Sequence, residues 1–221
     1  MPRGRIGRDR HAHLPEPERT LAAADPHLGD AIAAVIEAHG VQRYVKRTGF
    51  TPFQMLARAI VFQQLSGKAA ATIWGRFAAL CPGGRVTPEA IGALRFEDMR
   101  AAGLSTQKAT YLIDLAQHAR NRTVRFTRIG HLDDEAVIDS LTHVKGVGRW
   151  TAQMFLMFTL LRPDVLPEGD LGVRKGVQIV HRRPELPGPA EVLAAGANWA
   201  PHRSLACLYL WRIQDLQVPV E

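Results

Sequence analysis

The stretch LTHVKGVGRWTA, residues 141–152, places two glycines directly in front of an apolar helical run. Glycine is unfavourable inside a helix, so Gly146 and Gly148 predict a sharp turn between a helix ending near Leu141 and one beginning at Arg149. Backbone N–H groups and the positive end of the helix dipole meet at such an N-terminus, where residues without a Cβ let an anion come close. The stretch is therefore suited to binding a phosphate. The spacing is equally consistent with a corner that needs glycine only for its backbone conformation.

Helical periodicity continues along most of the chain. The segment DPHLGDAIAAVIEAHG, residues 25–40, begins with an aspartate and a proline, carries an apolar stripe and ends on a glycine. Further helices are expected at about 52–65, 67–80, 105–120, 133–141, 149–161, 171–182 and 201–214. Alternating strand-like runs are hard to find, and glycine or proline interrupts nearly every gap. The sequence therefore predicts an all-α fold.

Composition narrows the class of protein. The chain has 28 Lys and Arg residues against 21 Asp and Glu, which gives a net charge of +7. This excess favours a polyanionic partner, and nucleic acid is favoured over an acidic membrane surface. Cys81 and Cys207 are too few for a disulfide framework or an iron–sulfur cluster, and the histidines form no HExxH helical ligand set. No apolar run reaches membrane-spanning length or resembles a signal peptide. We expect a soluble, cytoplasmic protein with no membrane partner, nucleoid-associated if bacterial.

The turn-rich segment RPDVLPEGD, residues 162–170, marks a candidate boundary between lobes. A helix over 149–161 would be ~20 Å long. The chain from 162 to 169 can reach back by at most ~26 Å, so Asp170 can lie beside the glycine turn. Asp170 also directly precedes the helical segment LGVRKGVQIV, and the alternative is an ordinary helix N-cap. The two roles can coexist.

Four segments together resemble the helix-hairpin-helix DNA glycosylases that carry a Gly/Pro-rich loop followed by an aspartate. LTHVKGVGRWTA resembles their hairpin, and PEGDLGVRKG, residues 167–176, resembles the segment with their catalytic aspartate. PFQMLARAIVFQQLSGKAA, residues 52–70, and GLSTQKATYLIDLA, residues 103–116, extend the likeness over about residues 50–215. Within the family, the 3-methyladenine DNA glycosylase II group is the nearest match.

The resemblance implies two helical lobes with a DNA- and base-binding cleft between them. Residues 51–161 would form one lobe, with the helix-hairpin-helix at about 133–161, and residues 25–50 plus 162–221 the other. Fewer than about 30 residues precede the first expected helix, so the N-terminal β domain of the closest relatives is expected to be absent. Residues 1–24 are expected to form a disordered basic arm, with nucleic-acid contact as the alternative.

The implied reaction is hydrolysis of the N-glycosidic bond between deoxyribose and an alkylated base, 3-methyladenine and related purines, in base excision repair. Asp170 would stabilise the oxocarbenium-like sugar and position water. Relatives that also cut the strand carry a lysine directly after the GVGR motif, where this chain has Trp150, which predicts a monofunctional enzyme without a catalytic cofactor. The rivals are a non-catalytic helix-hairpin-helix DNA-binding protein and a bifunctional or mismatch-specific glycosylase.

The resemblance also implies a base pocket, lined by Trp150, Trp211, Met154 and Leu171. Met154 and Leu171 stand where the best-known member of the group has aromatic residues. We therefore expect a more open pocket that accepts several alkylated bases. For either tryptophan, the alternative is packing in the core.

Double-stranded DNA containing alkylated bases is the implied partner, bound by a monomer. The residues expected to contact it are Lys145, Gly146, Val147, Gly148 and Thr151 at the hairpin, Lys108 on the second strand, and Gln64 and Thr106 at the gap left by a flipped base. Threonine is a poor wedge, so Leu104 is an alternative to Thr106. Family hairpins often bind a monovalent cation, Na⁺ or K⁺, through main-chain carbonyls, which here would be those of Thr142, Val144 and Val147.

Overall fold

The computed structural model describes residues 11–45 and 49–216, and every regular element in these two ranges is a helix. This confirms the all-α prediction. The chain divides into two compact units, each of which is described by itself. The terminal unit combines Met1–Val45 with Arg162–Glu221, and the central unit is Lys46–Leu161. Within 11–45 and 49–216, no helix is both long and apolar enough to span a lipid bilayer.

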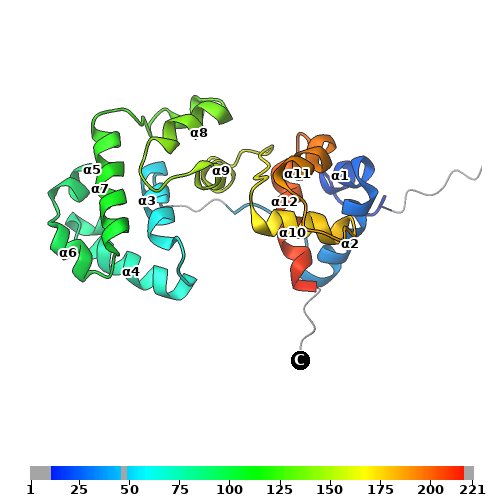
Figure 1. Cartoon of the computed structure of the whole chain (residues 1–221), viewed down its shortest axis with the longest axis horizontal. Coiled ribbons are helices and arrows are strands. Elements are labelled where there is room, and N and C mark those ends of the chain that lie inside the picture. The colour runs from blue at the N-terminus through cyan, green and yellow to red at the C-terminus, as the bar shows by residue number, and fades with distance from the viewer. Residues whose placement is uncertain (1–10, 46–48, 217–221) are drawn as a thin grey trace, which may run out of the picture. The chain divides into compact units, whose positions relative to one another are not determined.

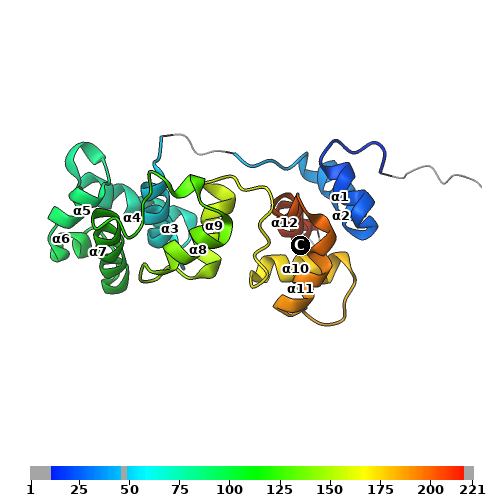
Figure 2. The ribbon, with the colours of Figure 1, turned by 90° about the horizontal axis from the view of Figure 1, so that it is seen from above.

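The terminal unit is built from both ends of the chain, blue and yellow to red in Figure 1. Its helices are α1 (Glu18–Ala24), α2 (Pro26–His39), α10 (Leu171–Val180), α11 (Pro189–Ala195) and α12 (Arg203–Arg212), with short 3-10 turns η3 (Gly196–Trp199) and η4 (Ile213–Leu216). Helix α12 packs against both α10 and α2, as the two views of Figures 1 and 2 agree. Gly176 permits the close approach of α10, because a Cβ there would lie 2.4 Å from the Leu210 carbonyl oxygen.

Part of the expected N-terminal arm is an ordered piece of this unit. Leu14 and Leu21 are buried, and Glu18 is fully buried on α1, where its carboxylate accepts a hydrogen bond from the Tyr209 hydroxyl at 2.6 Å and pairs with Arg43. The prediction of disorder over 1–24 is therefore wrong for residues 11–24. The segment is charged overall, but both of its leucines face the core and its buried carboxylate has partners. Residues 1–10 lie outside the described ranges.

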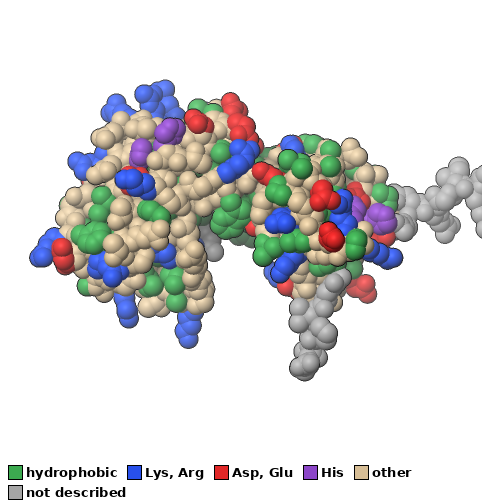
Figure 3. Space-filling model, viewed as in Figure 1, with side chains coloured by type: hydrophobic (Ala, Val, Ile, Leu, Met, Phe, Trp, Pro, Cys, Tyr) green, Lys and Arg blue, Asp and Glu red, His purple; other side chains and the backbone are tan. Residues whose placement is uncertain are grey.

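The central unit holds the remaining helices. They are α3 (Pro52–Phe62), α4 (Gly67–Ala79), α5 (Pro88–Ala93), α6 (Phe96–Ala101), α7 (Thr106–Arg120), α8 (Asp134–Thr142) and α9 (Arg149–Phe158), with 3-10 turns η1 (Pro82–Gly84) and η2 (Ile129–His131). Helix α7 packs against α3 and α5, and α8 packs against α9. On the face drawn in Figure 3, basic side chains are spread over this unit and acidic ones gather over α8.

Candidate functional site

Gly146 and Gly148 of the hairpin differ in how strictly the structure requires glycine. Gly146 has φ +79°, and a Cβ there would lie 2.1 Å from the Tyr111 ring, so both backbone and packing require glycine. Gly148, the N-cap of α9, has φ −92° and nothing within 4 Å of an added Cβ. The corner explanation therefore accounts for Gly146 and leaves Gly148 unexplained. Open space surrounds the position of a Cβ at Gly148, and the N–H groups of the first turn of α9 that follow have no partner four residues back in the helix.

Two side chains outside the motif, those of Asp114 and Gln63, hold the turn in place. The Asp114 carboxylate accepts a hydrogen bond from the Lys145 backbone N–H at 2.8 Å, and the Lys145 ammonium lies 3.3 Å from the same carboxylate. The Gln63 amide donates to the Gly146 carbonyl at 3.0 Å. Val144 and Val147 are buried on the inner side of the turn. The backbone conformation is thus set before any ligand arrives, although the charge of Lys145 is shared with Asp114.

Thr151 and Lys108 do not present their side chains as the sequence suggested. Thr151 is buried on α9, so a phosphate contact by its hydroxyl would require that side chain to move. The Lys108 ammonium donates to the carbonyls of Val61 and Gln63 at 2.7 and 2.6 Å, and burial lowers its pKa. The Lys108 ammonium therefore lies at the C-terminal end of α3, where carbonyls lack helical partners. A contact of Lys108 with the second DNA strand stays a prediction.

The candidates for filling the gap left by a flipped base lie in two turns. Gln64 is exposed just after α3, with φ +55°, so α3 ends at Phe62 and not near 65 as expected. Thr106 is exposed at the first position of α7. Leu104, the alternative wedge, is only 1% exposed and belongs to the core, so that alternative is wrong. Leu65, beside Gln64, is an exposed apolar side chain in the same turn, with 39% of its surface accessible. No motif in the sequence indicated that this leucine would be exposed.

Asp170 is the N-cap of α10, as one of its two predicted roles requires. Its Oδ1 accepts hydrogen bonds from the Val173 backbone N–H and the Trp211 indole N–H, both at 2.8 Å. Gly172 makes room for this contact, because a Cβ there would lie 2.6 Å from the Trp211 ring. Gln214 donates to the Gly172 carbonyl at 2.9 Å and ties α10 to the end of α12. The carboxylate is therefore held at one oxygen in a fixed orientation.

The four residues expected in the base pocket are all at least partly accessible. Trp150 is 48% exposed, and Met154, one helical turn further along the same face of α9, is half-buried. In the terminal unit, Leu171 is 52% exposed and Trp211 is half-buried beside Asp170. Core packing is therefore excluded for Trp150. A pocket formed by all four residues, and the cleft expected between the lobes, stay predictions.

The expected cation site of the hairpin consists of backbone oxygens. No group of three or more His, Cys, Asp or Glu side chains in residues 11–45 and 49–216 could hold a metal ion. The Val144 carbonyl accepts a hydrogen bond from the Val147 N–H at 3.0 Å, which leaves one of its two lone pairs for a cation. This geometry is compatible with the expected monovalent ion, which stays a prediction.

Comparison with known proteins agrees with these features. Residues 57–202 match the family described as HhH-GPD superfamily base excision DNA repair protein. DNA-3-methyladenine glycosylase 1 of Schizosaccharomyces pombe is 39% identical over 167 residues, which are 75% of this chain and 73% of that protein.

Two solved structures have the same architecture. The crystal structure of a DNA-3-methyladenine glycosidase from Bacillus halodurans matches with a TM-score of 0.76 at 39% identity, covering 89% of this chain and 88% of that one. The Schizosaccharomyces pombe 3-methyladenine DNA glycosylase in complex with abasic DNA matches with a TM-score of 0.73 at 34% identity, covering 88% of this chain and 98% of that one.

Proposed function

Because this chain belongs to the HhH-GPD superfamily of base excision DNA repair proteins, we propose that it is a monofunctional DNA glycosylase for alkylated bases. The reaction is hydrolysis of the N-glycosidic bond, which releases the base and leaves an abasic site. The observation that carries the proposal is the fixed Asp170 carboxylate at the start of α10. The names of the relatives, DNA-3-methyladenine glycosylases, support the same activity.

Asp170 acts where positive charge develops. An alkylated purine with a positively charged ring is already a good leaving group, so the enzyme has mainly to stabilise the oxocarbenium-like sugar and to position water. Hydrogen bonds from Val173 and Trp211 occupy Oδ1 and orient the carboxylate before the substrate binds. Such preorganised charge is among the largest contributions that an active site makes to a rate. No cofactor is needed for this chemistry.

The hairpin grips the DNA backbone. The N–H groups of Gly146 and Gly148 and of the first turn of α9 offer donors to a phosphate, and the missing Cβ of Gly148 leaves room for its oxygens. The Val147 N–H already donates to the Val144 carbonyl, so Val147 contributes through its place in the turn. Gln63 and Asp114 keep this turn in shape. A monovalent cation, held by the carbonyls of Thr142, Val144 and Val147, would add positive charge at the same place. The protein acts as a monomer on double-stranded DNA.

The pocket accepts several alkylated bases. Trp150 offers an exposed indole on which an extruded base can stack, and base–aromatic stacking contributes ~1 to 3 kcal/mol, similar to the cost of flipping. Met154 and Leu171 are not aromatic, so they add flexible apolar surface to the pocket without adding a stacking plane to those of the two tryptophans. Gln64 fills the gap in the duplex from its exposed turn.

Chromatography of the bases released from methylated duplex DNA tests the proposal. We expect 3-methyladenine and further alkylated purines to be released, with no covalent adduct after borohydride treatment, because Trp150 stands where a Schiff base would need lysine. DNA binding without base release would favour the non-catalytic module. A trapped adduct would favour a bifunctional enzyme. Release of one base only would contradict the broad pocket.

A further inference from the structure

A second candidate binding site lies in the central unit, away from the hairpin. It is a cavity of about 780 Å³, lined by residues from the start of α3, the segment leading into α5, and the end of α7 with the loop after it. We call it the arginine pocket. Its residues are Thr51, Pro52, Phe53, Gln54, Val86, Thr87, Pro88, Glu89, Ala119, Arg122, Val124, Arg125, Phe126, Thr127 and Arg128.

The arginine pocket and the hairpin lie at opposite ends of the same two helices. Helix α3 begins at the pocket with Pro52, and Gln63, just past its other end, bonds to Gly146 of the hairpin. Eleven residues of helix separate the two ends, a span of ~16 Å. Helix α7 runs the opposite way, with Lys108 of its first turn bonded to Gln63 and Ala119 of its last turn at the pocket. A ligand in the pocket would therefore not occupy the hairpin.

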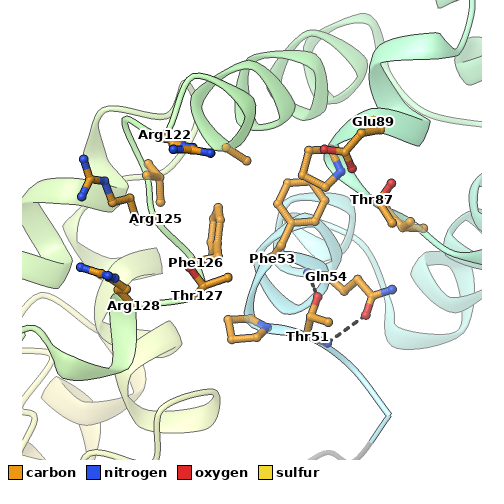
Figure 4. Close-up of a pocket in the computed structure, with 15 residues that line it drawn as sticks. Thr51, Phe53, Gln54, Thr87, Glu89, Arg122, Arg125, Phe126, Thr127 and Arg128 are labelled. Carbon is orange, nitrogen blue, oxygen red and sulfur yellow. Dashed lines mark hydrogen bonds between the residues drawn. The ribbon is translucent and has the colours of Figure 1, made fainter.

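The charge at the pocket is one-sided. Arg122, Arg125 and Arg128 are all exposed and line one side, across from Glu89 and Thr87 (Figure 4). No ion pair is recorded for these three arginines with any residue in 11–45 or 49–216. Three unpaired guanidinium groups on one rim present planar forks of donors that match carboxylates.

The floor of the pocket is apolar. Phe53 is 5% exposed and meets the half-buried Phe126 ring edge-on, with ring centroids 5.4 Å apart. Both rings lie between the arginine side and Glu89 (Figure 4). Val86 and Val124 add buried aliphatic surface. A DNA backbone offers such a floor only the small edge of a deoxyribose, whereas a peptide can place a whole apolar side chain on it with carboxylates on either side.

We propose that the arginine pocket docks an acidic segment of a partner protein, in which carboxylates flank an apolar side chain. The apolar side chain sits against Phe53 and Phe126, and the carboxylates pair with the three arginines. The cavity volume is within the range of pockets that enclose a ligand of this size, roughly 300 to 1,000 Å³. Arginines and aromatic side chains are also the residues that most often carry binding energy at protein interfaces. The partner would be held by the central unit while the hairpin holds DNA.

The test uses the whole protein and a fluorescently labelled peptide in which aspartates and glutamates flank a central Leu-Phe pair. The variant Arg125→Glu/Arg128→Glu should weaken peptide binding by about tenfold or more. The control Arg19→Glu/Arg95→Glu changes the net charge equally, on α1 and just before α6, and should bind the peptide as the parent does. A peptide with Ser-Gly in place of Leu-Phe should bind the parent more weakly, because it leaves the floor empty.

Duplex DNA supplies the second arm of the same experiment. The Arg125→Glu/Arg128→Glu protein should bind duplex DNA as well as the charge-matched control does, and duplex DNA should not displace the peptide from the parent. The proposal is overturned if the parent does not bind the peptide, or if both double variants lose it equally. It is also overturned if the pocket variant loses duplex binding instead, since the arginines would then belong to the DNA surface.

Discussion

Asp170 has an observed structural role as a helix cap, and the catalytic role proposed for it would use the same carboxylate. Its Oδ1 caps α10 through Val173 and accepts the Trp211 indole N–H, so the same bonds that start the helix also orient the group. The sequence predicts the cap, because capping is local to the residues that follow Asp170, whereas the catalytic role is implied by the family resemblance. It did not indicate the bond to Trp211, which is 41 residues away in the chain. That bond depends on the packing of α12 against α10 and on the missing side chain of Gly172.

Trp211→Phe tests this positioning. The change keeps an aromatic ring and removes the N–H, and a hydrogen bond to a charged group contributes roughly 1.5 to 3 kcal/mol. We expect kcat for base release to fall by about tenfold or more, with affinity for abasic duplex DNA nearly unchanged. Trp74→Phe is the control, because Trp74 contacts Phe77 and Phe50 in the central unit. A Trp211→Phe enzyme with the parent kcat would show that the indole N–H does not matter.

The hairpin shows what a local motif can and cannot predict. The turn, its helix boundaries and its glycines follow from the sequence, since each is decided within a few residues. The partners that hold the turn, Asp114 and Gln63, lie on α7 and α3, and only the fold brings them there. The contacts of Lys108 could not be predicted for the same reason, because nothing in its own helix reveals the carbonyls at the end of α3.

The two glycines of this element should respond differently to alanine. Gly146→Ala would place a Cβ 2.1 Å from the Tyr111 ring at φ +79°, so we expect a loss of roughly 2 kcal/mol or more in the free energy of unfolding.

Gly148→Ala meets no atom within 4 Å and should fold as stably as the parent. Its methyl group would stand in the way of a phosphate and weaken duplex binding by about tenfold. Urea denaturation and fluorescence anisotropy measure the two effects. Equal duplex affinity of Gly148→Ala and the parent would contradict a phosphate at this position.

Short helices were the elements that the sequence did not predict. Helices α5 and α6 have six residues each and α11 has seven, too few for a periodic apolar pattern to stand out. Local capping signals are present at two of them, with Thr87 and Pro88 at the start of α5 and Pro189 at the start of α11. Helix α1 was missed because its surroundings are charged, although Leu21 and the paired Glu18 bury it against the rest of the terminal unit.

At the scale of the whole molecule, the Asp164 carboxylate fixes the segment between α9 and α10 to α12. Asp164 accepts two hydrogen bonds from the Arg203 guanidinium, each at 2.7 Å, and Ser204 bonds to the Arg162 and Val165 carbonyls. The hydrogen bonds from Arg203 hold the pKa of Asp164 below its ordinary value of 3.8. Asp170 follows six residues later, so this anchor also determines where α10 can begin.

The lowered pKa of Asp164 predicts an acid-sensitive contribution to stability. A carboxyl whose pKa is lower in the folded state stabilises the protein above its unfolded pKa, and that contribution disappears as the pH falls through the folded pKa. Asp164→Asn should therefore be less stable than the parent near neutral pH, and the difference should shrink as the pH falls below about 4. Urea denaturation across this range measures it, with Asp98→Asn on the surface of α6 as the control. A constant difference at every pH would contradict the account.

Single-turnover release of 3-methyladenine from a duplex by Asp170→Asn tests whether the Asp170 carboxylate stabilises the developing sugar cation. Asparagine can still accept the Val173 and Trp211 hydrogen bonds at α10, so the variant should fold and bind duplex DNA with near-parent affinity. We predict that its rate of base release falls by about a hundredfold or more, while Asp98→Asn keeps the parent rate. Release by Asp170→Asn at the rate of the parent protein would contradict the claim.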